Sequence, residues 1–154
     1  MPGANFAATE LGGGADSSSD ARSSAARRNE MNNWVRVLII DDSDDDAEST
    51  ALALCRAGYT PIWQRVETAE AVEEAVTNRR WDVITCDLVT CGLDARAAMR
   101  IIRALAPRTP IIIVAEPGSE AHSAGLIEAG AFGVVSKRRL DVLGDLVANA
   151  IEDV

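Results

Sequence analysis

The chain has 154 residues, 47% hydrophobic and 25% charged, which is enough for one domain with a buried core. Its formal net charge of −9 and isoelectric point near 4.6 argue against nucleic acid and anionic membranes as direct partners, because both require a basic surface. A cytoplasmic protein without a membrane span is expected, since the chain has no apolar run of about 18 residues, no signal-peptide pattern and three cysteines without zinc spacing.

Residues 1–33 differ in composition from the rest of the chain. This segment is rich in Ala, Gly, Ser, Asn and Arg and has few large apolar side chains. Because such a segment buries too little surface to offset the entropy of ordering it, we predict a disordered N-terminal extension. Residues 34–154 are predicted to form the folded domain.

Strand and helix patterns alternate from residue 34 onward. Apolar runs predict strands at residues 35–40, 61–66, 83–87, 111–115 and 134–135. Amphipathic stretches predict helices from a Ser43 cap to Gly58, from a Thr68 cap to residue 78, and at residues 95–106, 119–129 and 140–151. This alternation, with right-handed crossovers, predicts an α/β fold: a doubly wound, five-stranded parallel sheet with five helices.

Charged side chains stand at the ends of three predicted strands. Asp41 and Asp42 follow the first strand, Asp87 ends the third, and Lys137, the only lysine in the chain, follows the fifth. The carboxyl ends of parallel strands meet at one crevice, where ligands bind. Because a divalent cation relieves the repulsion between neighbouring carboxylates, this set predicts a site for Mg²⁺ and phosphate.

Three more aspartates occupy residues 44–46. A calcium-binding loop that starts at Asp42 would need glycine at Ala47 and glutamate at Ala53, so this sequence excludes it. The first turn of a helix favours negative charge because of the helix dipole. We therefore interpret residues 44–46 as the solvated start of a helix.

From about residue 35 to its C-terminus, the chain resembles the response-regulator receiver family, the phosphoacceptor domains of two-component signalling. The matching segments are residues 37–43 (VLIIDDS), 82–88 (DVITCDL), 109–114 (TPIIIV), 128–131 (EAGA) and 134–137 (VVSK). The resemblance implies a flavodoxin-like receiver fold with strand order 2-1-3-4-5.

The resemblance also implies roles for the charged residues. Asp87 would be the nucleophile that accepts a phosphoryl group from a histidine kinase or phosphotransfer protein. Asp42, Asp87 and the backbone carbonyl of Val89 would bind Mg²⁺ directly, and Asp41 would act through water. Lys137 would contact a phosphoryl oxygen. In these roles the metal and the ammonium neutralise charge on the transferring group.

Three switch positions depart from the family pattern. The fourth strand ends in Ala115 where the family usually has Thr or Ser, and Glu116 follows where a small residue is usual. Val134 stands where an aromatic residue normally moves on activation. Glu116 would either repel an incoming phosphate or pair with Lys137 and imitate an occupied state; the sequence leaves both alternatives open.

Two functions are therefore compared. The first is a stand-alone receiver, expected because no output domain follows the last helix, that is phosphorylated on Asp87 and signals through protein contacts. It would not be an enzyme beyond self-catalysed phosphotransfer and autodephosphorylation. The alternative is a degenerate receiver that binds partners independently of phosphorylation. The downstream partner is unidentified. By the resemblance, a homodimer would use residues 119–129, 134–135 and 140–151, with contributions from Ala124, Ile127, Val142 and Val147.

Overall fold

The computed structural model describes residues 7–8, 33–90 and 93–152. Five of the six strands in its central sheet run parallel, and the spatial order of these five is the predicted 2-1-3-4-5. In that order the strands are β3 (Thr60–Val66), β2 (Trp34–Ile40), β4 (Val83–Asp87), β7 (Ile111–Ala115) and β8 (Gly133–Ser136). Both β4 and β7 are buried along their whole length, which explains their almost entirely apolar sequences.

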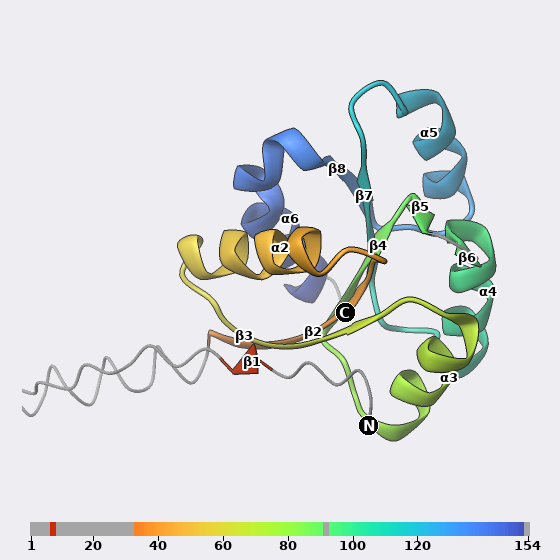
Figure 1. Cartoon of the computed structure of the whole chain (residues 1–154), viewed down its shortest axis with the longest axis horizontal. Helices are drawn as coiled ribbons and strands as arrows, with labels where there is room; N and C mark the ends of the chain where they lie inside the picture. Colours follow the sequence, from red (N-terminus) through yellow and green to blue (C-terminus); the bar gives the residue numbers. More distant parts are fainter. Residues whose placement is uncertain (1–6, 9–32, 91–92, 153–154) are drawn as a thin grey trace, which may run out of the picture.

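Helices cover both faces of the sheet (Figure 1). One face is covered by α2 (Asp44–Arg56) and α6 (Leu143–Glu152), and the other by α3 (Ala69–Asn78), α4 (Ala95–Leu105) and α5 (Glu120–Glu128). Successive β2 side chains divide between the two faces: Leu38 and Ile40 pack on the α3–α4 side, and Val37 and Ile39 on the α2–α6 side. Two apolar cores therefore hold the sheet between its helices. No helix in the described ranges has the length and apolar character needed to cross a bilayer.

The predicted helix caps are confirmed. Ser43 Oγ accepts a hydrogen bond of 3.1 Å from the N–H of Asp46, and Thr68 Oγ1 accepts one of 3.1 Å from the N–H of Ala71. Gly58 follows the end of α2 with φ of +99°, a left-handed conformation that glycine adopts without steric cost. Local sequence chemistry thus fixes where α2 and α3 begin.

Three short strands lie outside the predicted elements. The strand β1 (Ala7–Ala8) runs antiparallel to β3 and lies inside the segment predicted to be disordered. After Asp87, β5 (Val89–Thr90) and β6 (Leu93–Asp94) form a small antiparallel pair in the predicted loop. Elements of two residues are too short to show a hydrophobic period, so no periodic pattern predicts them. The rest of residues 1–32 lies outside the described residues.

The predicted start of the last helix is wrong. Residues Lys137–Val142 form a 3₁₀ helix, η2, and α6 begins only at Leu143. Ser136 Oγ accepts a hydrogen bond of 3.1 Å from the N–H of Arg138, while Arg139 has non-helical dihedral angles of −127° and 46°. Because apolar spacing does not distinguish a tight 3₁₀ turn from an α-helical one, the sequence pattern merged the two.

A glycine allows the close approach of α6 to the end of α2. A Cβ added to Gly144 would collide with the Cβ of Ala57, the residue that caps α2. We expect Gly144→Val to lower the free energy of unfolding by about 1–3 kcal/mol, because neither backbone can yield without repacking. Urea unfolding measures the change. Asn149→Val, at an exposed position of the same helix, is the control and should change stability by less than about 0.5 kcal/mol. Equal effects of the two changes would contradict this steric explanation.

Candidate phosphoacceptor and metal site

The sheet brings the predicted site residues to one edge. Asp41 and Asp42 follow β2, Asp87 is the last residue of β4, and Lys137 follows β8. The pairing of β2, β4, β7 and β8 is in register at these ends, so the charged side chains face a common crevice. The predicted juxtaposition is therefore present in the structure.

Three carboxylates lie close enough to share one metal ion. Oxygen atoms of Asp41, Asp42 and Asp87 all lie within 4.8 Å of one another; Asp41 and Asp87 are buried and Asp42 is exposed. Hard divalent cations prefer such oxygen donors, and Mg²⁺ in particular combines a few carboxylates with water and phosphate. The donor set therefore fits Mg²⁺. Val89 lies in β5 directly beyond this cluster, and a metal contact of its carbonyl stays a prediction.

Burial perturbs the two inner carboxyl groups. Burial, together with the charge of Asp87, raises the pKa of Asp41 to about 6, against the opposing effect of a 2.9 Å hydrogen bond from the N–H of Ser43. Burial also raises the pKa of Asp87, an effect that Lys137 opposes and that the charges of Asp42 and Glu116 reinforce. These carboxyl groups therefore repel one another, and a bound cation would reduce that repulsion.

Lys137 is surrounded by carboxylates. Its Nζ lies 2.8 Å from Asp46, 3.3 Å from Asp87, 3.3 Å from Glu116 and 4.0 Å from Asp41. Burial acts to lower the pKa of Lys137, but the hydrogen bond to Asp46 and the charges of Asp87 and Asp41 outweigh it and raise the pKa. The ammonium therefore stays protonated and is fixed beside the Asp87 carboxylate.

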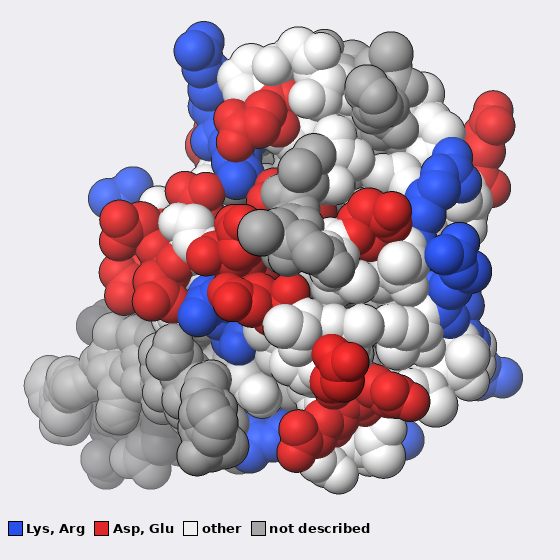
Figure 2. Space-filling view, turned by 45° about the vertical axis from the view of Figure 1, so that its right-hand side comes forward, with Lys and Arg blue, Asp and Glu red and all other residues white. Residues whose placement is uncertain are grey.

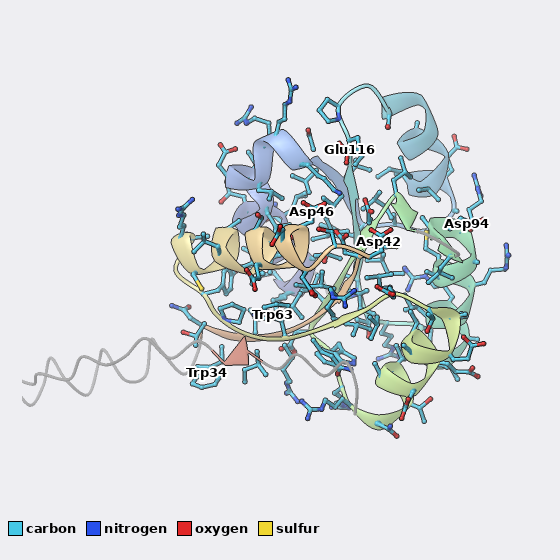
Figure 3. The ribbon with its side chains drawn as sticks, viewed as in Figure 1. Trp34, Asp42, Asp46, Trp63, Asp94 and Glu116 are labelled. Atoms are coloured by element: carbon cyan, nitrogen blue, oxygen red, sulfur yellow. The ribbon has the colours of Figure 1, made fainter. Side chains whose placement is uncertain are left out.

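Asp46 was missed by sequence reasoning. Residues 44–46 were interpreted as a solvated helix start, whereas Asp46 Oδ2 accepts the shortest hydrogen bond made by Lys137. Asp46 is the third residue of α2 after the Ser43 cap, a position whose side chain can turn back over the helix N-terminus. Figure 3 shows Asp42, Asp46 and Glu116 at the same end of the sheet. The position of Asp46, three residues after the helix cap, was the feature of the sequence that could have indicated this contact.

A second cation, Arg65 near the end of β3, was also missed. Its Nη1 donates hydrogen bonds of 3.0 Å to the backbone carbonyl of Asp41 and 2.7 Å to Glu67, and its Nε lies 2.5 Å from Asp44 Oδ1. Arg65 thus ties the turn after β2 to the end of β3. Asp44 is consequently an ion-pair partner as well as part of the helix start.

The three atypical switch positions differ in their surroundings. Ala115 is buried at the end of β7, and Val134 is half-buried and packs against the apolar core on the α3–α5 side. The side chain of Glu116 is 63% exposed, yet one of its oxygens lies 3.3 Å from Lys137 Nζ. Of the two alternatives for Glu116, pairing with Lys137 is the one observed here.

Acidic side chains dominate the molecular surface on this side (Figure 2). In the space-filling view, Asp and Glu residues form a broad patch near the start of α2, interrupted by a few basic side chains. Such a surface attracts cations and repels polyanions.

The family model for the response regulator receiver domain matches residues 37–147. The chain is 29% identical over 105 residues to the two-component response regulator ORR41 of Oryza sativa subsp. japonica, covering 67% of this chain and 83% of that protein. It is 30% identical over 123 residues to protein-glutamate methylesterase/protein-glutamine glutaminase 5 of Myxococcus xanthus, covering 74% of this chain. The match spans only 35% of the length of the Myxococcus protein.

Solved structures with the same fold include a receiver domain protein from Clostridium thermocellum, with a TM-score of 0.67, 21% identity and coverage of 77% of this chain and 95% of that one. Another is the receiver domain of a sensor histidine kinase from Pseudomonas aeruginosa PAO1, which has a magnesium ion in its active-site cleft. It has a TM-score of 0.65, 21% identity and coverage of 77% and 98%. The chain belongs to the response regulator receiver domain family, a family of two-component signalling domains.

Proposed function

We propose that this chain accepts a phosphoryl group on the Asp87 carboxylate, in a Mg²⁺-dependent reaction, from a phosphohistidine of a histidine kinase or phosphotransfer protein. The observation that carries the proposal is the meeting of Asp87 with two further carboxylates and the Lys137 ammonium at one sheet edge. The phosphorylated domain would then signal through protein contacts in the cytoplasm, without acting as an enzyme on other substrates.

The reaction needs little covalent chemistry from the protein. A phosphorus–oxygen bond to Asp87 forms as the phosphorus–nitrogen bond of the donor histidine breaks, and the electron pair returns to the imidazole. Asp42, Asp87 and the Val89 carbonyl would hold Mg²⁺ directly and Asp41 through water; the ion would supply charge neutralisation for the phosphoryl oxygens. Lys137 provides a second, fixed positive charge 3.3 Å from Asp87.

The direct test is labelling by a small phosphodonor such as acetyl phosphate, followed by intact mass. We expect the mass of one phosphoryl group to appear with Mg²⁺ and to be absent with EDTA, because the buried carboxylates repel a dianion without the metal. Labelling that is equally fast in EDTA would contradict a metal-dependent mechanism. Labelling absent from both samples would contradict the proposed function itself.

A second candidate function is binding to partner proteins independently of phosphorylation. Ala115 lacks the hydroxyl that the family uses at this position, Val134 replaces the aromatic switch residue, and Lys137 already has the Glu116 carboxylate as a partner. In this case, the affinity for a partner would be unchanged by Asp87→Asn or by Mg²⁺ removal. A change in affinity with either would favour the phosphorylation-dependent function.

The predicted dimer face needs one correction. Val147 was expected to contribute to the face formed by α5, β8 and α6, but it is fully buried against the sheet. Ile127, at 43% exposure, and Ala124 are exposed on α5. Any homodimer formed through this face would therefore use α5 rather than Val147.

A further inference from the structure

We propose that Glu116 is a built-in competitor of the phosphoryl group: its carboxylate occupies Lys137, and phosphorylation of Asp87 must displace it. Asp46 is the anchor that keeps Lys137 in place during this exchange. The inference rests on the proposed function and concerns the regulation of the same site.

The donor count of Lys137 supports the competition. A lysine ammonium has three N–H groups and no other donor. Three carboxylates, from Asp46, Asp87 and Glu116, lie 2.8–3.3 Å from its nitrogen, so close carboxylates are as many as N–H groups. A phosphoryl oxygen that binds Lys137 therefore competes with these carboxylates for the same three N–H groups.

Exposure indicates which carboxylate leaves. The side chain of Glu116 is 63% exposed, that of Asp46 is 44% exposed, and that of Asp87 is 6% exposed. Asp46 makes the shortest contact with Lys137, and Asp87 is the acceptor itself. Exposed ion pairs are weak because water screens them and replaces the lost contact. Glu116 is therefore the partner that a phosphoryl oxygen displaces most easily.

The negative charge of Glu116 also opposes phosphorylation of Asp87. Glu116 follows the end of β7, next to the strand that carries Asp87, and its charge adds to the negative field at the Asp87 carboxyl. A carboxylate in this position repels an approaching phosphodonor before the bond to Asp87 forms. Both effects slow phosphorylation of Asp87.

Glu116→Gln tests the competition because it removes the charge and keeps the shape of the side chain. We expect acetyl phosphate to label this variant about threefold to tenfold faster than wild type at the same Mg²⁺ concentration. Glu128→Gln, at an exposed position at the end of α5, is the matched control and should label at the wild-type rate. An unchanged rate in Glu116→Gln, with wild type labelled normally, would overturn the proposal.

The single lysine of the chain allows a second measurement that does not depend on activity. Protein labelled with ¹³C and ¹⁵N in lysine alone gives one side-chain signal, that of Lys137. We expect Glu116→Gln and Asp46→Asn each to shift this signal, and Glu128→Gln to leave it unchanged. A signal unaffected by Glu116→Gln would show that the contact is absent in solution and would overturn the proposal.

The two measurements separate this inference from the proposed function. If wild type and Glu116→Gln both fail to label, the proposed function fails, and competition with a phosphoryl group fails with it even when the lysine signal shifts. If both label at one rate, phosphorylation stands and the competition fails. Faster labelling together with a shifted lysine signal supports the competition.

Discussion

Asp87→Asn is expected to abolish phosphoryl labelling by acetyl phosphate in the presence of Mg²⁺. The Asp87 carboxylate is buried, with 6% of its side chain exposed, and lies 3.3 Å from Lys137 Nζ. An amide oxygen is a far weaker nucleophile than a carboxylate and cannot form a stable acyl phosphate, whereas its size leaves the packing of β4 unchanged. Intact mass after incubation should show only unmodified protein.

Asp45→Asn is a suitable control, because Asp45 lies exposed in the first turn of α2 on the same acidic surface. It should be labelled like wild type. Circular dichroism of Asp87→Asn should match that of wild type, which excludes unfolding as the cause of lost labelling. If Asp87→Asn were labelled normally, the phosphoryl group would be on another residue and the assignment of Asp87 would be wrong.

Lys137→Met is expected to slow labelling at least 100-fold, because removal of one preorganised electrostatic contact typically reduces a rate by about 10²–10³-fold. The substitution keeps an unbranched side chain, one atom shorter, but leaves the carboxylates of Asp46, Asp87 and Glu116 without their shared cation. Single-exponential fits to the labelled fraction give the rate for each protein.

A measurement of Mg²⁺ binding distinguishes slower phosphoryl transfer in Lys137→Met from disruption of the metal site. Lys137→Met should bind Mg²⁺ at least as tightly as wild type by calorimetry, because it loses a competing cation beside Asp87. Arg138→Met removes a neighbouring exposed cation and should leave the labelling rate unchanged. A rate loss of similar size in both variants would indicate that net charge, rather than the Lys137 contact, controls the reaction.

The fold was largely predictable because its signals are local. The apolar runs that became β4 and β7, the Ser43 and Thr68 caps, and the glycine after α2 all act within a few residues. The same locality explains the failures. The 3₁₀ turn at Lys137–Val142 has the same apolar spacing as the helix that follows it, and β1 is a strand only through its pairing with β3.

The site residues that lie at the ends of strands could be predicted from the sequence. Asp41, Asp42, Asp87 and Lys137 each lie at such an end, and parallel pairing brings strand ends together. Asp46 and Arg65 were not identified, because their contacts join α2 to the end of β8 and β3 to the turn after β2. Those partners are 91 and 24 residues away in the chain.

The order of residues alone determined the alternation of strands and helices, and with it the edge of the sheet at which three aspartates and the solitary lysine lie. Tertiary structure decided how that lysine is shared. The pairing of β7 with β8 places Ala115 opposite Ser136, and in the folded chain the Glu116 carboxylate that follows lies 3.3 Å from Lys137 Nζ. Electrostatic energies change steeply over a few ångströms, so these pairings depend on coordinates that no local pattern specifies.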